Sequence, residues 1–231
     1  EYLVSGNNVP YAYQSVMGRM NYSYNNRYFS ELGLSYSGSE QFPKGKRFGL
    51  FPSISAGWVV SNEDFLKNNS AINFLKVRGS VGLLGNDNIG AGRFTYNQYY
   101  YYTGGYTLGV NNDQGMGSIG EGTIGNPNIT WEKSTKFNLG IESKLFTNFN
   151  LNVDVFYDKR TGILADRSAS TPGVLGIGVA TENVGKVTNK GFEIVLNYSN
   201  KAGEFEYYAN GNASYSISKI DYMDEVVRPH N

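Results

Sequence analysis

Eight stretches of this sequence alternate between apolar and polar side chains, and this period restricts the possible folds more than any other feature. In residues 135–145, Phe137 and Leu139 lie on one side of the alternation, whereas Lys136 and Glu142 lie on the other. Side chains of a strand point in turn to the two faces of a sheet. The pattern therefore predicts a sheet with one apolar and one polar face. No Asp, Glu, Lys or Arg falls on the apolar side of these stretches.

The predicted strands are joined by connections of two kinds. With ends set to within about 2–4 residues, the strands are 15–24, 28–37, 49–60, 74–84, 134–145, 149–158, 191–199 and 204–218. Tight connections (25–27, 146–148, 200–203) and a moderate one (61–73) alternate with long ones at 38–48, 85–133 and 159–190. An up-and-down antiparallel sheet would then carry compact turns at one end and long loops at the other. Outer-membrane barrels have this asymmetry, whereas the Greek-key connections of a sandwich give no reason for it.

Aromatic residues on the apolar side gather near both ends of the predicted strands. Tyr36, Tyr157 and Tyr215 lie toward the long connections. Toward the tight turns lie Tyr22, Tyr24, Tyr28, Trp58, Phe149, Tyr198, Phe205 and Tyr207. Two aromatic rows on either side of aliphatic residues are typical of strands that cross a bilayer. The pattern also leaves open a soluble sheet whose apolar face packs as a core.

The composition excludes several classes of protein. The 20 Lys and Arg residues balance the 20 Asp and Glu residues, so no net charge attracts nucleic acid, and the absence of cysteine excludes a disulfide framework. No apolar run approaches the ~18 residues of a membrane helix. This excludes a helical membrane protein but not a membrane β-barrel. We expect residues 1–231 to be one partial all-β domain, truncated at both ends.

The residues that could carry catalysis do not form a convincing constellation. The single histidine, His230, stands at the end of the chain, away from any predicted strand. The charged residues of the polar side are better explained as the lining of a wet barrel lumen, because barrel interiors are polar. The predicted lumen-lining residues are Arg19, Glu31, Lys76, Arg78, Lys136, Glu142, Asp154 and Glu193. We therefore expect no enzymatic activity.

Two glycine patterns and one polar cluster in the long connection are weak signals for a cofactor. Residues 115–120 and 120–125 both match GxGxxG, but neither follows a buried strand or opens a helix, as a dinucleotide site requires. These glycines are expected to let the loop fold tightly. The cluster at 111–113 lacks calcium-loop spacing. No cofactor or metal is predicted.

A run of tyrosines in the same connection is the best candidate for contact with a ligand or partner. Rings on both faces of an extended segment can stack on sugars or on peptide side chains, and protein interfaces also favour Tyr. The candidates are Tyr99, Tyr100, Tyr101, Tyr102 and Tyr106, with Arg93 and Asp87 as possible polar partners.

Four passages resemble one known family. They are residues 51–86, 126–142 (NPNITWEKSTKFNLGIE), 154–164 (DVFYDKRTGIL) and 183–198 (NVGKVTNKGFEIVLNY). In this order they resemble the barrel of SusC/RagA-type TonB-linked outer-membrane transporters of Bacteroidetes. The likeness runs from about residue 15 to about residue 221.

The resemblance implies a segment of about eight strands from a 22-stranded transmembrane β-barrel. It also implies an N-terminal plug, a SusD-like surface lipoprotein over the mouth, and TonB-energised uptake of glycans or peptides at the bacterial outer membrane. Neither a plug nor a TonB box is found in this sequence. Two other hypotheses stay open at this point: a soluble carbohydrate-binding β-sandwich, and an outer-membrane adhesin or passive porin.

Overall fold

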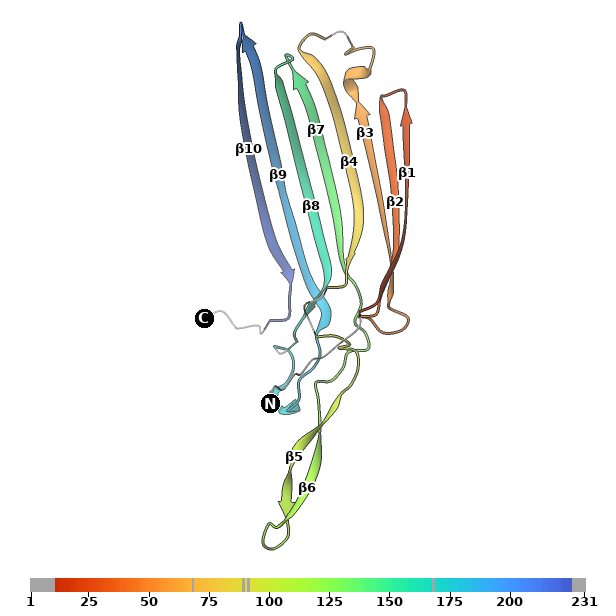
Figure 1. The fold of residues 1–231 in the computed structure, drawn as a ribbon, viewed down its shortest axis with the longest axis vertical. Coiled ribbons are helices and arrows are strands. Elements are labelled where there is room, and N and C mark those ends of the chain that lie inside the picture. Colours follow the sequence, from red (N-terminus) through yellow and green to blue (C-terminus); the bar gives the residue numbers. More distant parts are fainter. Residues whose placement is uncertain (1–10, 68, 89, 91, 168, 226–231) are drawn as a thin grey trace, which may run out of the picture.

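The computed structural model, which describes residues 11–67, 69–88, 90, 92–167 and 169–225, is an all-β fold of antiparallel strands joined by turns and loops. One sheet contains eight strands in the order β1-β2-β3-β4-β7-β8-β9-β10 (Figure 1). Their bounds are β1 Tyr13–Tyr24, β2 Tyr28–Ser39, β3 Phe48–Val59, β4 Ile72–Asn86, β7 Glu132–Leu145, β8 Phe149–Ala165, β9 Glu182–Ala202 and β10 Phe205–Tyr222. Two short 3₁₀ helices, η1 (Val60–Asn62) and η2 (Gly173–Leu175), lie in the connections. Among the described residues, no helix has the length and apolarity needed to cross a membrane.

The connections are sorted by end, as the sequence predicts. The turns at 25–27, 146–148 and 203–204 and the connection at 60–71 lie at one end of the sheet, which we call the turn end. The connections at 40–47, 87–131 and 166–181 lie at the other, the loop end (Figure 1). Each strand pairs with its neighbour in an antiparallel register, so the up-and-down topology is confirmed.

Two of the predicted boundaries are wrong. Half of the connection expected at 159–190 is strand, because β8 continues to Ala165 and β9 begins at Glu182. Cross-strand pairing extends these strands past the apolar residues that define the period. The connection expected at 85–133 contains a separate two-stranded sheet of β5 (Tyr100–Leu108) and β6 (Gln114–Glu121). This hairpin projects beyond the loop end (Figure 1).

The apolar face of the sheet, formed by the residues of the apolar alternation, has no second layer against it in the described part of the chain. The packed element pairs are sheet neighbours, apart from the contact of η1 with β4. Leu139 is 55% exposed, and Val153 and Ile194 are half-buried only by their own sheet. Monomeric soluble proteins rarely expose so large an apolar surface. The arrangement does not agree with a β-sandwich, in which this face would be covered.

The residues with the least exposure form a small cluster at the loop end. Phe42 and Ile129 are fully buried, and Trp131 and Phe51 nearly so. The Trp131 ring lies 5.2 Å from the rings of both Phe42 and Phe51, and its Nε1 donates a hydrogen bond of 2.9 Å to the carbonyl of Arg47. We call this the loop-base cluster. It joins the connection at 40–47 to strand β3 and to the start of β7.

At the turn end, Glu63 joins the connection at 60–71 to two aromatic residues of the apolar face. Its carboxylate accepts hydrogen bonds from Tyr28 Oη (2.6 Å) and Trp58 Nε1 (3.0 Å), and Arg27 lies 2.9 Å away. The hydrogen bond from Tyr28, then that from Trp58, lowers the pKa of Glu63. Glu63 therefore fixes the orientation of the phenol and the indole at this end of the strands.

The lowered pKa of Glu63 predicts a pH dependence. Because the pKa is lower in the folded chain than in the unfolded chain, the carboxylate stabilises this end at neutral pH. That contribution disappears as the pH falls through the folded pKa. We expect Glu63→Gln to speed amide hydrogen exchange across residues 60–71 relative to the unmodified protein at neutral pH, and the ratio of the two rates to approach one at acid pH. Asp64→Asn is the matched control, since Asp64 is largely exposed and its ion pair with Arg27, at 3.2 Å, lies outside the contacts of Glu63 with the two aromatic residues. An equal effect of both substitutions would contradict the assigned role.

Candidate functional site on the polar face and at the loop end

Arg78 joins three adjacent strands on the polar face. Its Nε donates to Glu142 at 2.7 Å, and its Nη2 donates to Asp154 at 2.8 Å. Its Nη1 donates to the side-chain oxygen of Asn138 at 3.1 Å. The guanidinium reaches across β7 because residue 140, the register partner of both Arg78 and Asp154, is glycine. A Cβ at Gly140 would lie 2.6 Å from Asp154 Oδ1 and 2.8 Å from Arg78 Cζ.

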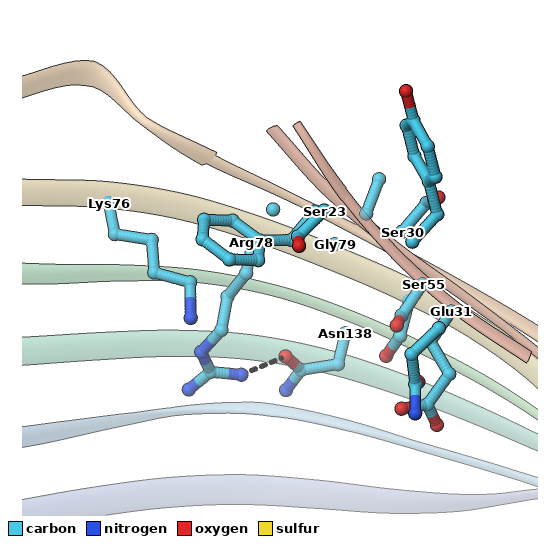
Figure 2. Close-up of a pocket in the computed structure, with 14 residues that line it drawn as sticks. Ser23, Ser30, Glu31, Ser55, Lys76, Arg78, Gly79 and Asn138 are labelled. Carbon is cyan, nitrogen blue, oxygen red and sulfur yellow. Dashed lines mark hydrogen bonds between the residues drawn. The ribbon is translucent and has the colours of Figure 1, made fainter. Parts of the chain in front are cut away.

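A hollow of about 460 Å³ opens on the polar face beside this ion-pair network. Figure 2 shows Lys76 and Arg78 on one side of it and Glu31 and Ser55 on the other, with the hydrogen bond from Arg78 to Asn138 dashed. The Lys76 ammonium lies 5.9 Å from the centre of the Phe29 ring. The hollow thus combines an aromatic ring with cationic, anionic and hydroxyl groups, and its walls can hydrogen-bond a polar ligand or a polar protein segment.

The register places all eight predicted lumen-lining residues on the same face. Asp154 pairs with Glu193 across β8 and β9, and Lys76 pairs with Glu142 across β4 and β7. Farther toward the loop end, Lys136 lies 3.9 Å from the nearly buried Asp158, which also accepts a hydrogen bond from Ser134. Arg19 and Glu31 lie on this face in β1 and β2. The polar face therefore carries interleaved cations and anions rather than one sign of charge.

The two longest connections at the loop end form one unit. Ile124 pairs with Val179 in a parallel bridge, in which the Ile124 N–H donates to Gly178 and the Ala180 N–H donates to Ile124, both at 2.9 Å. The side chain of Asn183 donates to the carbonyls of Thr130 (2.8 Å) and Gly162 (2.7 Å) and accepts from the Thr130 N–H (2.9 Å). These bonds attach both connections to strands β8 and β9.

The hairpin carries four of the five candidate tyrosines. Tyr100 and Tyr102 lie on one face with Ile119, whereas Tyr101 and Tyr106 lie on the other with Met116. A bulge at Gly104–Gly105 separates Tyr106 from the run, and Gly105 has φ +77°, which favours glycine. Tyr102 is 89% exposed. The first GxGxxG match lies within β6, so its glycines form a strand rather than a tight loop.

Arg93 and Asp87 both contact Tyr11, which lies just before the start of β1. Arg93 pairs with Glu40, and its guanidinium lies 4.8 Å from the Phe94 ring centre and 5.6 Å from that of Tyr11. Tyr11 donates a hydrogen bond to Asp87. Burial, followed by this hydrogen bond, raises the pKa of Tyr11. Arg93 therefore helps to hold the loop end together. His230 lies outside the described residues.

Four residues with structural roles here were not predicted from the sequence as site residues: Asn138, Asp158, Asn183 and Trp131. Asn138 and Asp158 fall in predicted strands, where the alternation assigns them to a face without indicating a partner, and Asn183 falls in the connection expected at 159–190. Trp131 precedes the predicted strand at 134–145, so no period marks it. The charged and amide side chains of the polar face hydrogen-bond one another and line the hollow beside Arg78. This arrangement suits the binding of a polar ligand or a polar protein segment.

Replacing Arg78 tests the importance of the network. Arg78→Ala leaves Glu142 and Asp154 close together without the guanidinium that bonds both of them. Removing one partner of a buried ion pair costs about 3–5 kcal/mol, and the partial exposure of these side chains reduces our expectation to about 1–3 kcal/mol. Chemical unfolding of the full-length protein measures this loss. Arg19→Ala, in an exposed position on the same face, should cost less than about 0.5 kcal/mol, and an equal cost for both would contradict the prediction.

The fold by itself indicates the class of protein. A single antiparallel sheet with an uncovered apolar face, a polar opposite face and loops sorted by end is a sector of an outer-membrane-type β-barrel. A family model described as "TonB dependent receptor-like, beta-barrel" matches residues 4–229. The chain belongs to this family.

Similar proteins agree with this assignment. The chain is 30% identical to TonB-dependent receptor P26 of Formosa agariphila over 92% of this chain and 22% of that protein. It is 32% identical to TonB-dependent receptor SusC of Bacteroides thetaiotaomicron over 79% of this chain and 18% of that protein. The chain thus spans about a fifth of the length of these relatives. The structure of the RagAB peptide importer in the 'open-open' state matches with a TM-score of 0.79 and 23% identity, over 92% of this chain and 22% of that one, which shows the shared fold.

Proposed function

We propose that this chain forms part of the barrel wall of a TonB-dependent importer in the bacterial outer membrane. The observation that carries the proposal is the two-sided sheet: its apolar face lies uncovered between two aromatic rows, and its polar face holds the Arg78 network. In a closed barrel the apolar face contacts lipid, and the polar face lines the lumen. The family match favours an importer over an adhesin or a passive porin. The barrel wall, the lumen surface and the loops would act by binding, and no chemical step is assigned to this chain.

The substrate is proposed to be a glycan or a peptide, with a SusD-like lipoprotein as partner at the loop end. SusC is among the curated relatives, and RagAB, whose structure shares the fold, is described as a peptide importer. The residues that contact substrate or partner would lie on the hairpin and on the two joined connections, because recognition is concentrated in loops on a rigid scaffold. TonB would act through a part of the protein outside this chain.

Two double substitutions on the hairpin test this role. Tyr100→Ser with Tyr102→Ser removes the rings of one face, and Tyr101→Ser with Tyr106→Ser removes those of the other. Aromatic hot spots contribute about 2 kcal/mol or more, so we expect at least one pair to reduce uptake, or retention of the lipoprotein on co-purification, by about tenfold or more. Each pair is the control for the other, because both remove two phenols from the same strand. Normal uptake and normal retention with both pairs would contradict a recognition role for the hairpin.

A further inference from the structure

The loop end of strands β7 to β10 carries five lysines on the apolar face. The residues are Lys133, Lys159, Lys186, Lys190 and Lys219, and we call them the lysine patch. They stand just beyond the boundaries expected from the sequence, where the strands continue. No charged residue falls on the apolar side of the strands as predicted from the sequence. Charged residues occur on that side only where the observed strands continue past the predicted ends.

The strand register fixes the side on which these lysines lie. Lys159 is two residues beyond Tyr157 on the same strand, so both side chains point to the apolar face. Lys190 is the register partner of Tyr157 itself. Lys133 and Lys186 both pair with Thr161, and Lys159 and Lys219 both pair with Thr188. The patch therefore contains two neighbouring rows in which a threonine separates two lysines.

The patch is exposed and carries a net positive charge. All five lysines are exposed, and the ion pairs of lysine found among the described residues involve Lys136 and Lys201 instead. Among the described residues of β7 to β10 on this face, the acidic group beside the patch is Asp221, which accepts a hydrogen bond from Thr188. Arg160 and Asp158 stand next to Lys159 along the chain but belong to the polar face. Five cations with one carboxylate form a surface that attracts anions.

The depth of the patch identifies the kind of anion. Aromatic side chains such as Tyr157 and Tyr215 take positions at the edge of the hydrocarbon layer. Two residues of strand advance about 7 Å, so with the usual tilt the two rows stand about 5 and 10 Å beyond the Tyr157 row. The headgroup region is about 5–7 Å thick on each side of the bilayer. The row of Lys159, Thr188 and Lys219, which is the nearer of the two to Tyr157, therefore lies at headgroup depth.

We propose that the lysine patch binds the phosphate groups of anionic lipid in the leaflet on the loop side. The inference rests on the proposed membrane location. Paired ammonium groups on flexible stems can reach one phosphate from two sides, and a threonine hydroxyl between them supplies a further donor. A second copy of this chain fits poorly, because a two-fold contact would place like charges together. The patch also lies directly next to the apolar surface, just as the headgroup of a lipid lies directly next to its acyl chains.

The test uses the full-length protein and lipid A as the phosphate-bearing probe. Native mass spectrometry measures retention of lipid A and of enzymatically dephosphorylated lipid A. The variant combines Lys159→Gln, Lys186→Gln and Lys219→Gln. The control combines Lys67→Gln, Lys144→Gln and Lys201→Gln, which removes the same charge at the turn end. A lysine near an anionic surface contributes about a fivefold factor, so the patch variant should bind lipid A about 100-fold more weakly. The control and the dephosphorylated probe should show no such difference.

The other outcomes overturn the proposal in distinct ways. Equal weakening by both variants would show an unspecific charge effect, and unchanged retention by the patch variant would remove the site. Displacement of lipid A by excess inorganic phosphate would identify a free-anion site. Loss of the lipoprotein on co-purification, with lipid retention intact, would assign the patch to a protein partner. Membrane fractionation of the unmodified protein tests the proposed outer-membrane location separately. If that location is wrong, the unmodified protein itself will be absent from the outer-membrane fraction.

Discussion

Val153→Arg is expected to prevent stable insertion of the full-length protein into the outer membrane. Val153 stands in β8, midway between Phe149 and Tyr157, and its register partners Ile141 and Ile194 are apolar. An arginine on the lipid side of a barrel costs about 2–4 kcal/mol at the bilayer midplane. We expect the folded protein in the outer-membrane fraction to fall by about tenfold or more, as measured by the heat-modifiable mobility of the barrel on gels.

Asn152→Arg provides a control one residue away on the same strand. Asn152 lies on the polar face, where its register partner Glu142 can form an ion pair with the new arginine. This substitution should leave the amount of folded protein in the membrane nearly unchanged. If both arginines were tolerated equally, or if the polar-face arginine were the worse, the apolar face would not contact lipid and the importer proposal would fail.

Trp131→Ala is expected to release the loop end while leaving the sheet folded. Trp131 is 3% exposed, and it contacts both rings of the loop-base cluster. Replacing a buried aromatic residue by Ala costs about 3–5 kcal/mol. This cost lowers the free energy of local opening of the loops and not that of unfolding the sheet. Limited proteolysis within residues 87–131 should therefore be about 100-fold faster. Uptake should fall as well, because the cluster positions the base of the hairpin.

Two further substitutions separate the contributions of Trp131. Trp131→Phe keeps a ring in the cluster and removes the hydrogen bond to Arg47, so its effect on proteolysis should be about tenfold. Trp58→Phe changes the tryptophan at the turn end and should not change cleavage of the loops. Equal cleavage of the Trp131→Ala protein and the unmodified protein would show that the loops are held by other contacts, such as those of Asn183.

Much of the sheet could be predicted from the alternation alone. Every strand from β1 to β4 and from β7 to β10 has a segment in which one side is apolar, and a shift of one residue would exchange the two faces. Strand ends were less predictable. The segments beyond Asp158 and before Lys190 have no apolar side, because lysine and threonine replace aliphatic residues there. Backbone pairing with a formed neighbour extends the sheet through such segments.

The candidate site was predictable only as a list of residues on one face. The sequence assigns Arg78, Glu142 and Asp154 to the polar side, but their contact depends on which strands become neighbours. Because β5 and β6 form a separate sheet, β4 pairs directly with β7, and this pairing places Arg78 beside Glu142. The sequence predicted rings on both faces of the tyrosine run, whereas the placement of Tyr106 on the face of Tyr101 required the β5–β6 register.

The sequence by itself determined that this protein forms a two-sided sheet with turns at one end and loops at the other. Local spacing of side chains carries that information, since each strand shows its faces without reference to the others. The tertiary structure alone decided the Arg78 network, the joining of the two long connections and the lysine patch. Each of these depends on register between segments distant in the chain, which is set by pairing and packing over the whole sheet.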